Sequence, residues 1–187
     1  MRLSKITTRT GDDGSTGLGD GSRCAKDSAR ITLLGEVDEL NSVLGVVLSQ
    51  PLPAPYADWL VAVQHDLFDL GSEVAVPGYL AITDTQVLRL EGWLTTLNAP
   101  LSPLKEFVLP GGCPAAAHAH VARAVARRAE RAVVTLSREE MPSPHLLHYL
   151  NRLSDFLFVL ARTLNQAAHV PDVLWQHTSQ PKPTQPV

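Results

Sequence analysis

Apolar residues recur at alternating spacings of three and four along most of this 187-residue chain, and this pattern constrains the fold more than any other feature. One run lies in residues 29–49 and a second in residues 56–75, with Pro51, Pro53 and Pro55 between them. Because a helical turn takes 3.6 residues, this spacing puts the apolar side chains on one helix face. The pattern predicts two amphipathic helices joined by an extended connector.

Three further segments carry the same spacing together with helix start signals. Each begins with a capping box or with a proline in the first turn. The predicted segments run from Thr83 to about Asn98, from about Cys113 to Ser137, and from Ser143 to Leu164. Five helices without a convincing strand predict an all-α, five-helix bundle.

The composition is that of an ordinary globular chain, with 44% hydrophobic and 19% charged residues. A net charge of −3 gives no general attraction to nucleic acid or anionic membranes, so neither partner is expected. We expect no membrane span and no secretory signal, and two cysteines suit a cytoplasmic location. A single domain is expected over residues 1–175, followed by a disordered tail over residues 176–187.

Residues 6–28 form an N-terminal arm that is too rich in Gly, Thr, Ser and Asp for a helix or a buried strand. Its glycines allow backbone N–H groups to face an anion, while Arg9 and Lys26 add positive charge. The standard phosphate motif does not match, since the Gly14-x4-Gly19 segment lacks the following Lys-Ser/Thr. The arm is therefore either a nucleotide-binding loop or a disordered extension.

Charged residues form one stripe on the fourth predicted helix. Its members are Arg123, Arg127, Glu130 and Arg131. Like charges four residues apart repel by a few tenths of a kcal/mol, roughly, unless an anion lies among them. A polyphosphate would meet that need, and a solvated surface stripe is the alternative.

A second polar stripe on the last helix is expected to face solvent. It consists of Asn151, Asp155, Phe158 and Arg162. The seven histidines do not predict a zinc site. His118 and His120 point in different directions on a helix, and the pair His145 and His148 has no third ligand nearby.

Seven motifs in one order carry a family resemblance. They are the Thr-x-Thr-Gly-Asp-x-Gly loop at residues 8–14, Lys26-Asp27, the segment 35–42, Phe107-Val-Leu-Pro-Gly-Gly, His120-Val-Ala-Arg123, Arg127-Arg-Ala-Glu-Arg131, and Leu150-Asn-Arg-Leu-Ser-Asp155. From residue 5 to about 175 the chain resembles the trimeric, PduO-type ATP:cob(I)alamin adenosyltransferases. The resemblance implies a homotrimer with active sites at subunit interfaces, where ATP and cob(I)alamin give adenosylcobalamin and triphosphate with Mg²⁺ present.

The resemblance also implies roles for single residues. Residues 1–28 would be an ATP-binding loop, with contacts from Thr8, Arg9, Thr10, Gly11, Thr16, Gly17 and Lys26. Arg127, Glu130, Arg131 and Asn151 would bind ATP from the helices. Asp38 and Arg123 match an inter-subunit ion pair, and Phe107 matches an aromatic residue beneath the corrin that keeps the lower nitrogen ligand away. Arg127, Phe107, Asp38 and Arg123 are thus the expected catalytic residues.

Without the resemblance, core packing is the simpler interpretation of Phe107. Asp13 replaces a lysine that is common in the family, and Cys113 replaces a small hydroxyl residue that would cap the fourth helix. A reductase or an adenosylcobalamin-dependent enzyme is an expected partner. A nucleotide- or corrinoid-binding bundle without catalysis is the alternative function, whereas the missing Gly-Lys-Ser/Thr disfavours a kinase.

Overall fold

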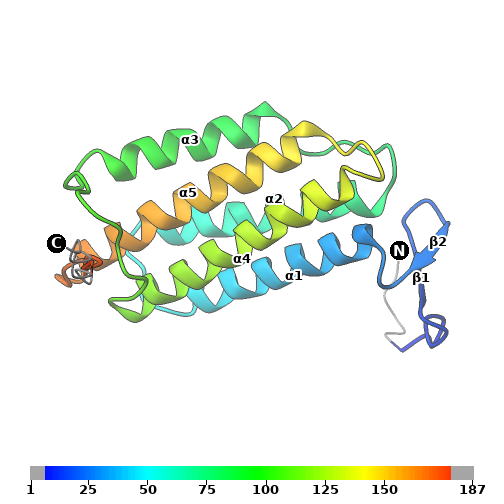
Figure 1. Cartoon of the computed structure of the whole chain (residues 1–187), viewed down its shortest axis with the longest axis horizontal. Coiled ribbons are helices and arrows are strands. Elements are labelled where there is room, and N and C mark those ends of the chain that lie inside the picture. The colour runs from blue at the N-terminus through cyan, green and yellow to red at the C-terminus, as the bar shows by residue number, and fades with distance from the viewer. Residues whose placement is uncertain (1–6, 178–187) are drawn as a thin grey trace, which may run out of the picture.

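The computed structural model describes residues 7–177, so residues 1–6 of the arm and residues 178–187 of the predicted tail lie outside the described part. Within it, five helices form a bundle with one small hairpin beyond its end (Figure 1). The helices are α1 (Ala29–Leu48), α2 (Tyr56–Ala75), α3 (Asp84–Asn98), α4 (Pro114–Leu136) and α5 (Pro144–Ala167). The prediction of five helices is confirmed.

Local hydrogen bonds fix where the helices begin. Ser28 caps α1, because its Oγ accepts from the Ile31 N–H at 3.4 Å. Thr83 and Gln86 form both halves of the predicted capping box on α3. Cys113 precedes α4, but its side chain makes no capping hydrogen bond there. The sequence signals therefore mark the helix starts, and α4 begins with a proline in place of a side-chain cap.

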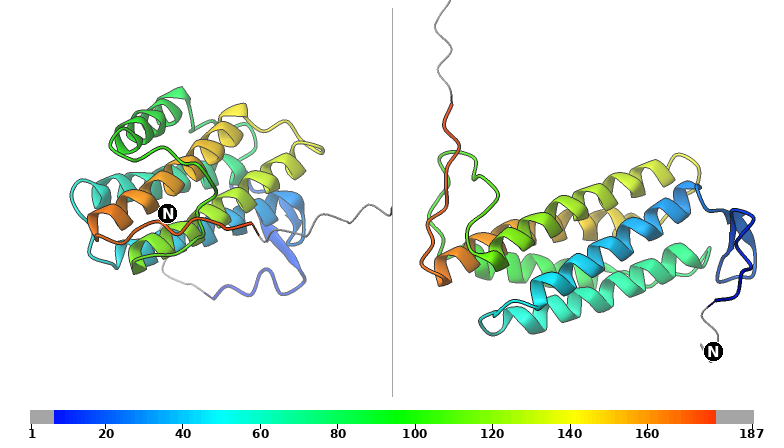
Figure 2. Two further views of the ribbon diagram at one scale, coloured as in Figure 1. Left: turned by 60° about the vertical axis from the view of Figure 1, so that its left-hand side comes forward. Right: turned by 90° about the horizontal axis from the view of Figure 1, so that it is seen from below.

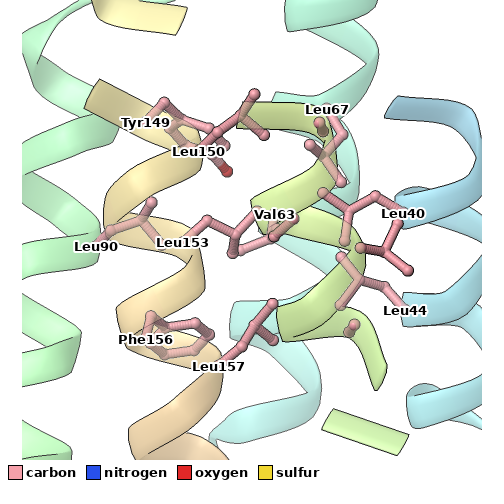
Figure 3. Close-up of a cluster of buried hydrophobic side chains, with 14 of the residues drawn as sticks. Leu40, Leu44, Val63, Leu67, Leu90, Tyr149, Leu150, Leu153, Phe156 and Leu157 are labelled. Carbon is pink, nitrogen blue, oxygen red and sulfur yellow. The ribbon is translucent and has the colours of Figure 1, made fainter. Parts of the chain in front are cut away.

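The core lies between α4 and α5 and the helices around them. α1 packs on α4, α3 on α5, and α2 on α1. Leucines and valines from four helices meet in this core (Figure 3): Leu40, Leu44, Val63, Leu67, Leu90, Leu150, Leu153 and Leu157. α4 contributes mainly alanines, of which Ala116, Ala119, Ala122, Ala126 and Ala129 are fully buried. Small side chains let the backbones of α4 and its neighbours approach closely.

The arm contains two short strands that the sequence did not predict. β1 (Ser15–Gly17) and β2 (Arg23–Ala25) pair antiparallel with Thr16 opposite Cys24. The strands are three residues long and largely exposed, so they carry no apolar alternation that could reveal them. The Gly19 N–H donates to the Ala75 carbonyl at 2.8 Å and ties the hairpin to the end of α2. The described part of the arm is thus folded.

The two ends of the bundle carry different features. The hairpin lies beyond the end where α1 begins, whereas the segment between α3 and α4 lies at the opposite end with the C-terminal segment (Figures 1 and 2). None of the helices in residues 7–177 has the length and apolar character that a membrane crossing needs.

Candidate functional site

The arm forms a compact turn around one lysine. The Lys26 Nζ donates to the Gly11 carbonyl at 2.7 Å, and its backbone N–H donates to the Gly14 carbonyl at 2.9 Å. A Cβ on Gly11 would lie 2.8 Å from the Ser15 carbonyl oxygen, so only glycine fits there. The Thr8 and Thr10 hydroxyls lie 3.0 Å apart. Five of the predicted arm residues thus lie close together, including Arg9 between the two threonines.

Arg23, which the sequence did not single out, holds this turn. Its guanidinium donates to the Thr10 carbonyl at 2.6 Å and to the Ser15 hydroxyl. Asp13 accepts from the backbone and hydroxyl of Ser15, and these hydrogen bonds, with a smaller effect of Arg23, lower the pKa of Asp13. Asp13 is therefore a structural residue of the loop. Thr16 and Gly17 lie in β1 beside this turn.

Side chains from α4 and α5 form the polar half of the site. The Asn151 amide donates to Glu130 Oε1 at 2.9 Å, and the Arg131 guanidinium donates to the Arg127 carbonyl at 3.0 Å. The structure therefore brings together the predicted residues Glu130 and Asn151. Arg152, which the sequence did not single out, donates to Oδ1 of the Asn151 side-chain amide and fixes the orientation of that amide.

The α4 arginines have very different surroundings. Arg128 pairs with Glu36 and Glu39 of α1, and these hydrogen bonds raise the pKa of Arg128. Within residues 7–177, Arg123 and Arg127 have no such carboxylate partner. Burial, and then the charge of Arg127, lowers the pKa of Arg123. The stripe thus holds uncompensated positive charge, which favours an anionic ligand.

A pocket of about 340 Å³ lies against this charge. Arg123 and Arg127 line it together with Asn98, Ser154 and Phe158. Its size is within the range of small-molecule sites, at the low end. The expectation that the second polar stripe faces solvent is correct for exposed Asp155 but wrong for Arg162, which is 6% exposed.

Phe107 lies on the loop between α3 and α4 and is 75% exposed. Core packing of this ring, the simpler interpretation, is therefore wrong. The loop pairs with the C-terminal segment, where the Trp175 N–H donates to the Phe107 carbonyl at 2.8 Å and Val108 forms a β-bridge with Leu174. The Trp175 and Phe107 rings lie 6.2 Å apart. His177, in the predicted tail, lies beside Trp175.

A second pocket, of about 590 Å³, borders Phe107. Its wall also contains Val108, His120, Arg123 and Phe158. Arg123 and Phe158 therefore line both pockets. A site with an exposed aromatic ring therefore shares a wall with a site of uncompensated positive charge.

Three residues that the sequence did not mark as functional anchor the Phe107 loop. Asn165 accepts from the Cys113 N–H at 2.9 Å and donates to the Gly111 carbonyl at 3.2 Å. Arg162 forms an ion pair with Asp172 at 2.8 Å and donates to the loop carbonyl of Ser102. α5 thus holds both ends of the loop and the C-terminal segment.

Two predicted contacts do not occur within one chain. Asp38 is exposed on α1, and in the described part of the chain no ion pair joins it to Arg123. No hydrogen bond or ion pair of residues 7–28 reaches α4 or α5. Groups of three or more metal-ligating side chains do not occur among residues 7–177 either.

Comparison with known proteins identifies the family. A family model described as cobalamin adenosyltransferase matches residues 6–164. The chain belongs to the cobalamin adenosyltransferase family. A cobalamin adenosyltransferase of Cupriavidus metallidurans is 56% identical over 176 residues, which cover 94% of this chain and 96% of that protein. A corrinoid adenosyltransferase of Bacillus subtilis is 40% identical over 182 residues, with 94% of each chain covered. The family resemblance of the sequence is confirmed.

Solved structures of cobalamin adenosyltransferases share this fold. A variant of the PduO-type ATP:corrinoid adenosyltransferase from Lactobacillus reuteri, complexed with cobalamin and ATP, superposes with a TM-score of 0.88 at 34% identity. The match covers 92% of this chain and 100% of that one. A second variant, complexed with ATP, has a TM-score of 0.86 at 35% identity and covers 91% and 100%.

Proposed function

We propose that this chain transfers the 5′-deoxyadenosyl group of ATP to cob(I)alamin and releases adenosylcobalamin and triphosphate. The observation that carries the proposal is the wall shared by the two pockets: Arg123 and Phe158 line both the pocket that contains Arg127 and the pocket that contains Phe107. ATP phosphates would lie by Arg127 and the corrin by Phe107. The family relatives named for this activity, and those complexed with both ligands, support this assignment.

The reaction explains why cationic groups are needed at this wall. The cobalt(I) electron pair attacks C5′ of ATP, the Co–C bond forms, and the C5′–O5′ bond breaks with its electrons leaving on triphosphate. Negative charge grows on the leaving group in the transition state, and preorganised guanidiniums stabilise it. Arg127, which has no acidic partner in residues 7–177, is the residue we assign to this task. Glu130 and Asn151 would position the nucleotide through their mutual hydrogen bond.

We propose that the ATP-binding arm comes from another subunit, and the place of the arm beyond the bundle end opposite to the segment between α3 and α4 supports this (Figure 1). We propose a homotrimer in which Thr8, Arg9, Thr10, Gly11, Thr16, Gly17 and Lys26 of a neighbour close over the phosphates. Asp38 of one subunit would pair with Arg123 of the next. Removing one partner of such an ion pair would destabilise the assembly by about 3–5 kcal/mol if the pair is buried, and by little if it is exposed.

Phe107 would act on the corrin from its exposed position. An aromatic ring under the cobalt excludes the lower nitrogen ligand, and a four-coordinate cobalt is easier to reduce.

Mg²⁺ fits this site as a companion of ATP, because Mg²⁺ is commonly held by substrate phosphates with few protein carboxylates. Glu130 is the carboxylate of the stripe that could hold it, and Mg²⁺ would neutralise phosphate charge. We also propose a cytoplasmic location, with a reductase or an adenosylcobalamin-dependent enzyme as partner.

Two neighbouring arginines give a matched test. Arg127→Ala should lower adenosylcobalamin formation from ATP and cob(I)alamin by about 10²- to 10³-fold, the effect of one lost transition-state donor. Arg128→Ala removes an equal charge from the adjacent position, but this side chain faces α1. The rate of Arg128→Ala should therefore stay within about threefold of the wild-type rate. The cobalt–carbon bond is followed by absorbance. Near-wild-type turnover of Arg127→Ala would refute the assigned role, and ATP binding without any product in the unmodified protein would refute catalysis.

A further inference from the structure

His120 is a buried histidine without a polar partner. Its side chain is 3% exposed, and neither ring nitrogen has a hydrogen-bond partner in the described part of the chain. Buried polar groups are nearly always hydrogen-bonded, and leaving one unsatisfied destabilises the folded state. A histidine kept in this condition at a pocket wall points to a ligand that supplies the missing partner when the imidazole turns toward the pocket.

The surroundings of His120 restrict the kind of ligand that fits. It lies in the wall of the 590 Å³ pocket with Phe107 and Arg123, and its ring meets the Phe158 ring edge-on at 6.1 Å. Burial, and then the charge of Arg123, lowers the pKa of His120, while Asp172 has a smaller opposite effect. The imidazole is therefore neutral near pH 7, with one N–H donor and one acceptor nitrogen.

We infer that His120 binds a carboxamide on the rim of the corrin. A primary amide offers an acceptor oxygen and N–H donors, which match the two nitrogens of a neutral imidazole. An anionic group would pair with Arg123 instead, and an apolar group would leave both nitrogens unsatisfied. The inference rests on the proposed function, because it places the corrin in the Phe107 pocket.

Two variants separate this role from simple core packing. His120→Leu keeps the volume but removes both polar atoms, and His120→Asn keeps a donor and an acceptor. His120→Leu should bind cob(II)alamin about 10-fold more weakly, while its affinity for ATP is unchanged. Its melting temperature should equal or exceed that of the wild type, since an unsatisfied buried group is gone. His120→Asn should recover part of the corrinoid affinity.

Cob(II)inamide distinguishes the amide from the rest of cobalamin, because it keeps the rim amides and lacks the lower nucleotide. Equal losses of affinity for both corrinoids in His120→Leu support the inference. A loss for cob(II)alamin alone, unchanged affinity for both, or a lowered melting temperature that accounts for the loss would overturn it. If the wild-type protein itself binds neither corrinoid and forms no adenosylcobalamin, the proposed function fails, which is a separate result.

Discussion

Asn165 should control how firmly the Phe107 loop is held. Its side chain is 2% exposed and hydrogen-bonds Cys113, Gly111 and, at 3.4 Å, Asp172. Truncation to alanine removes all three hydrogen bonds at once. At about 1 kcal/mol net for each, and allowing for imperfect geometry, Asn165→Ala should lower the free energy of unfolding by about 2–3 kcal/mol. This is a fall in melting temperature of roughly 4–12 °C for a chain of this size.

Asn165→Ala should also weaken function at the Phe107 pocket, but not at the pocket that Arg123 and Arg127 border. The loop carries Phe107, so corrinoid binding should weaken and adenosylation starting from cob(II)alamin should fall more than adenosylation from cob(I)alamin. ATP affinity should stay near the wild-type value, because Asn165 does not line the pocket that Arg123 and Arg127 border. Urea unfolding and titration with each substrate measure the two effects.

Gln166→Ala is the matched control, since it removes an exposed amide from the next position of α5. Asn165→Asp is a sharper variant, because a carboxylate would replace the amide that now donates to Asp172. The two carboxylates would repel at neutral pH, and the stability deficit should shrink as the pH falls and one of them takes a proton. An Asn165→Ala protein as stable as Gln166→Ala would refute the proposed anchor.

Two further variants test other contacts. The buried Tyr149 hydroxyl donates to Asp66 at 2.8 Å, and burial, with Asp66, raises the pKa of Tyr149 well above 10.0. The unfolded chain loses this proton above pH 10 while the folded chain keeps it, so wild-type stability should fall there. Tyr149→Phe should lose about 1–2 kcal/mol at pH 7 but show a smaller alkaline fall in urea unfolding; an equal fall contradicts this. A Cβ on Gly19 would lie 2.4 Å from Val76 Cγ2. Gly19→Ala should displace the arm and weaken ATP binding about 10-fold, by isothermal titration, with little change in melting temperature; unchanged binding contradicts it.

The helices were predictable because their determinants are local. The capping box of Thr83 and Gln86 and the prolines that start α4 and α5 act within one turn, and the apolar spacing repeats within each helix. The strands of the arm were not predictable, since three-residue strands held by turns and by Gly19 have no periodic pattern. Local signals therefore determine the elements, and long-range contacts determine the hairpin.

The site was predictable only in part, for the same reason. Helical spacing and the family resemblance predicted Arg127, Glu130 and Asn151 as site residues, and the structure places Glu130 beside Asn151. Arg162 has the same sequence pattern as an exposed residue, but the C-terminal segment folds back and buries it against Asp172. No pattern in α5 could indicate a partner that lies outside the helix.

The α4 helix shows how one element can serve two ligands. His120, Arg123 and Arg127 are spaced by three and four residues, so they share a face and span about 10 Å along the axis. His120 borders the Phe107 pocket, Arg127 borders the charged pocket, and Arg123 borders both. Arg128 is one residue from Arg127, but a rotation of about 100° turns it toward α1 and its two carboxylates. In residues 7–177, polar groups without a partner therefore follow the face that borders the two pockets, and under the proposed function the reacting bond would lie near Arg123, where the pockets meet.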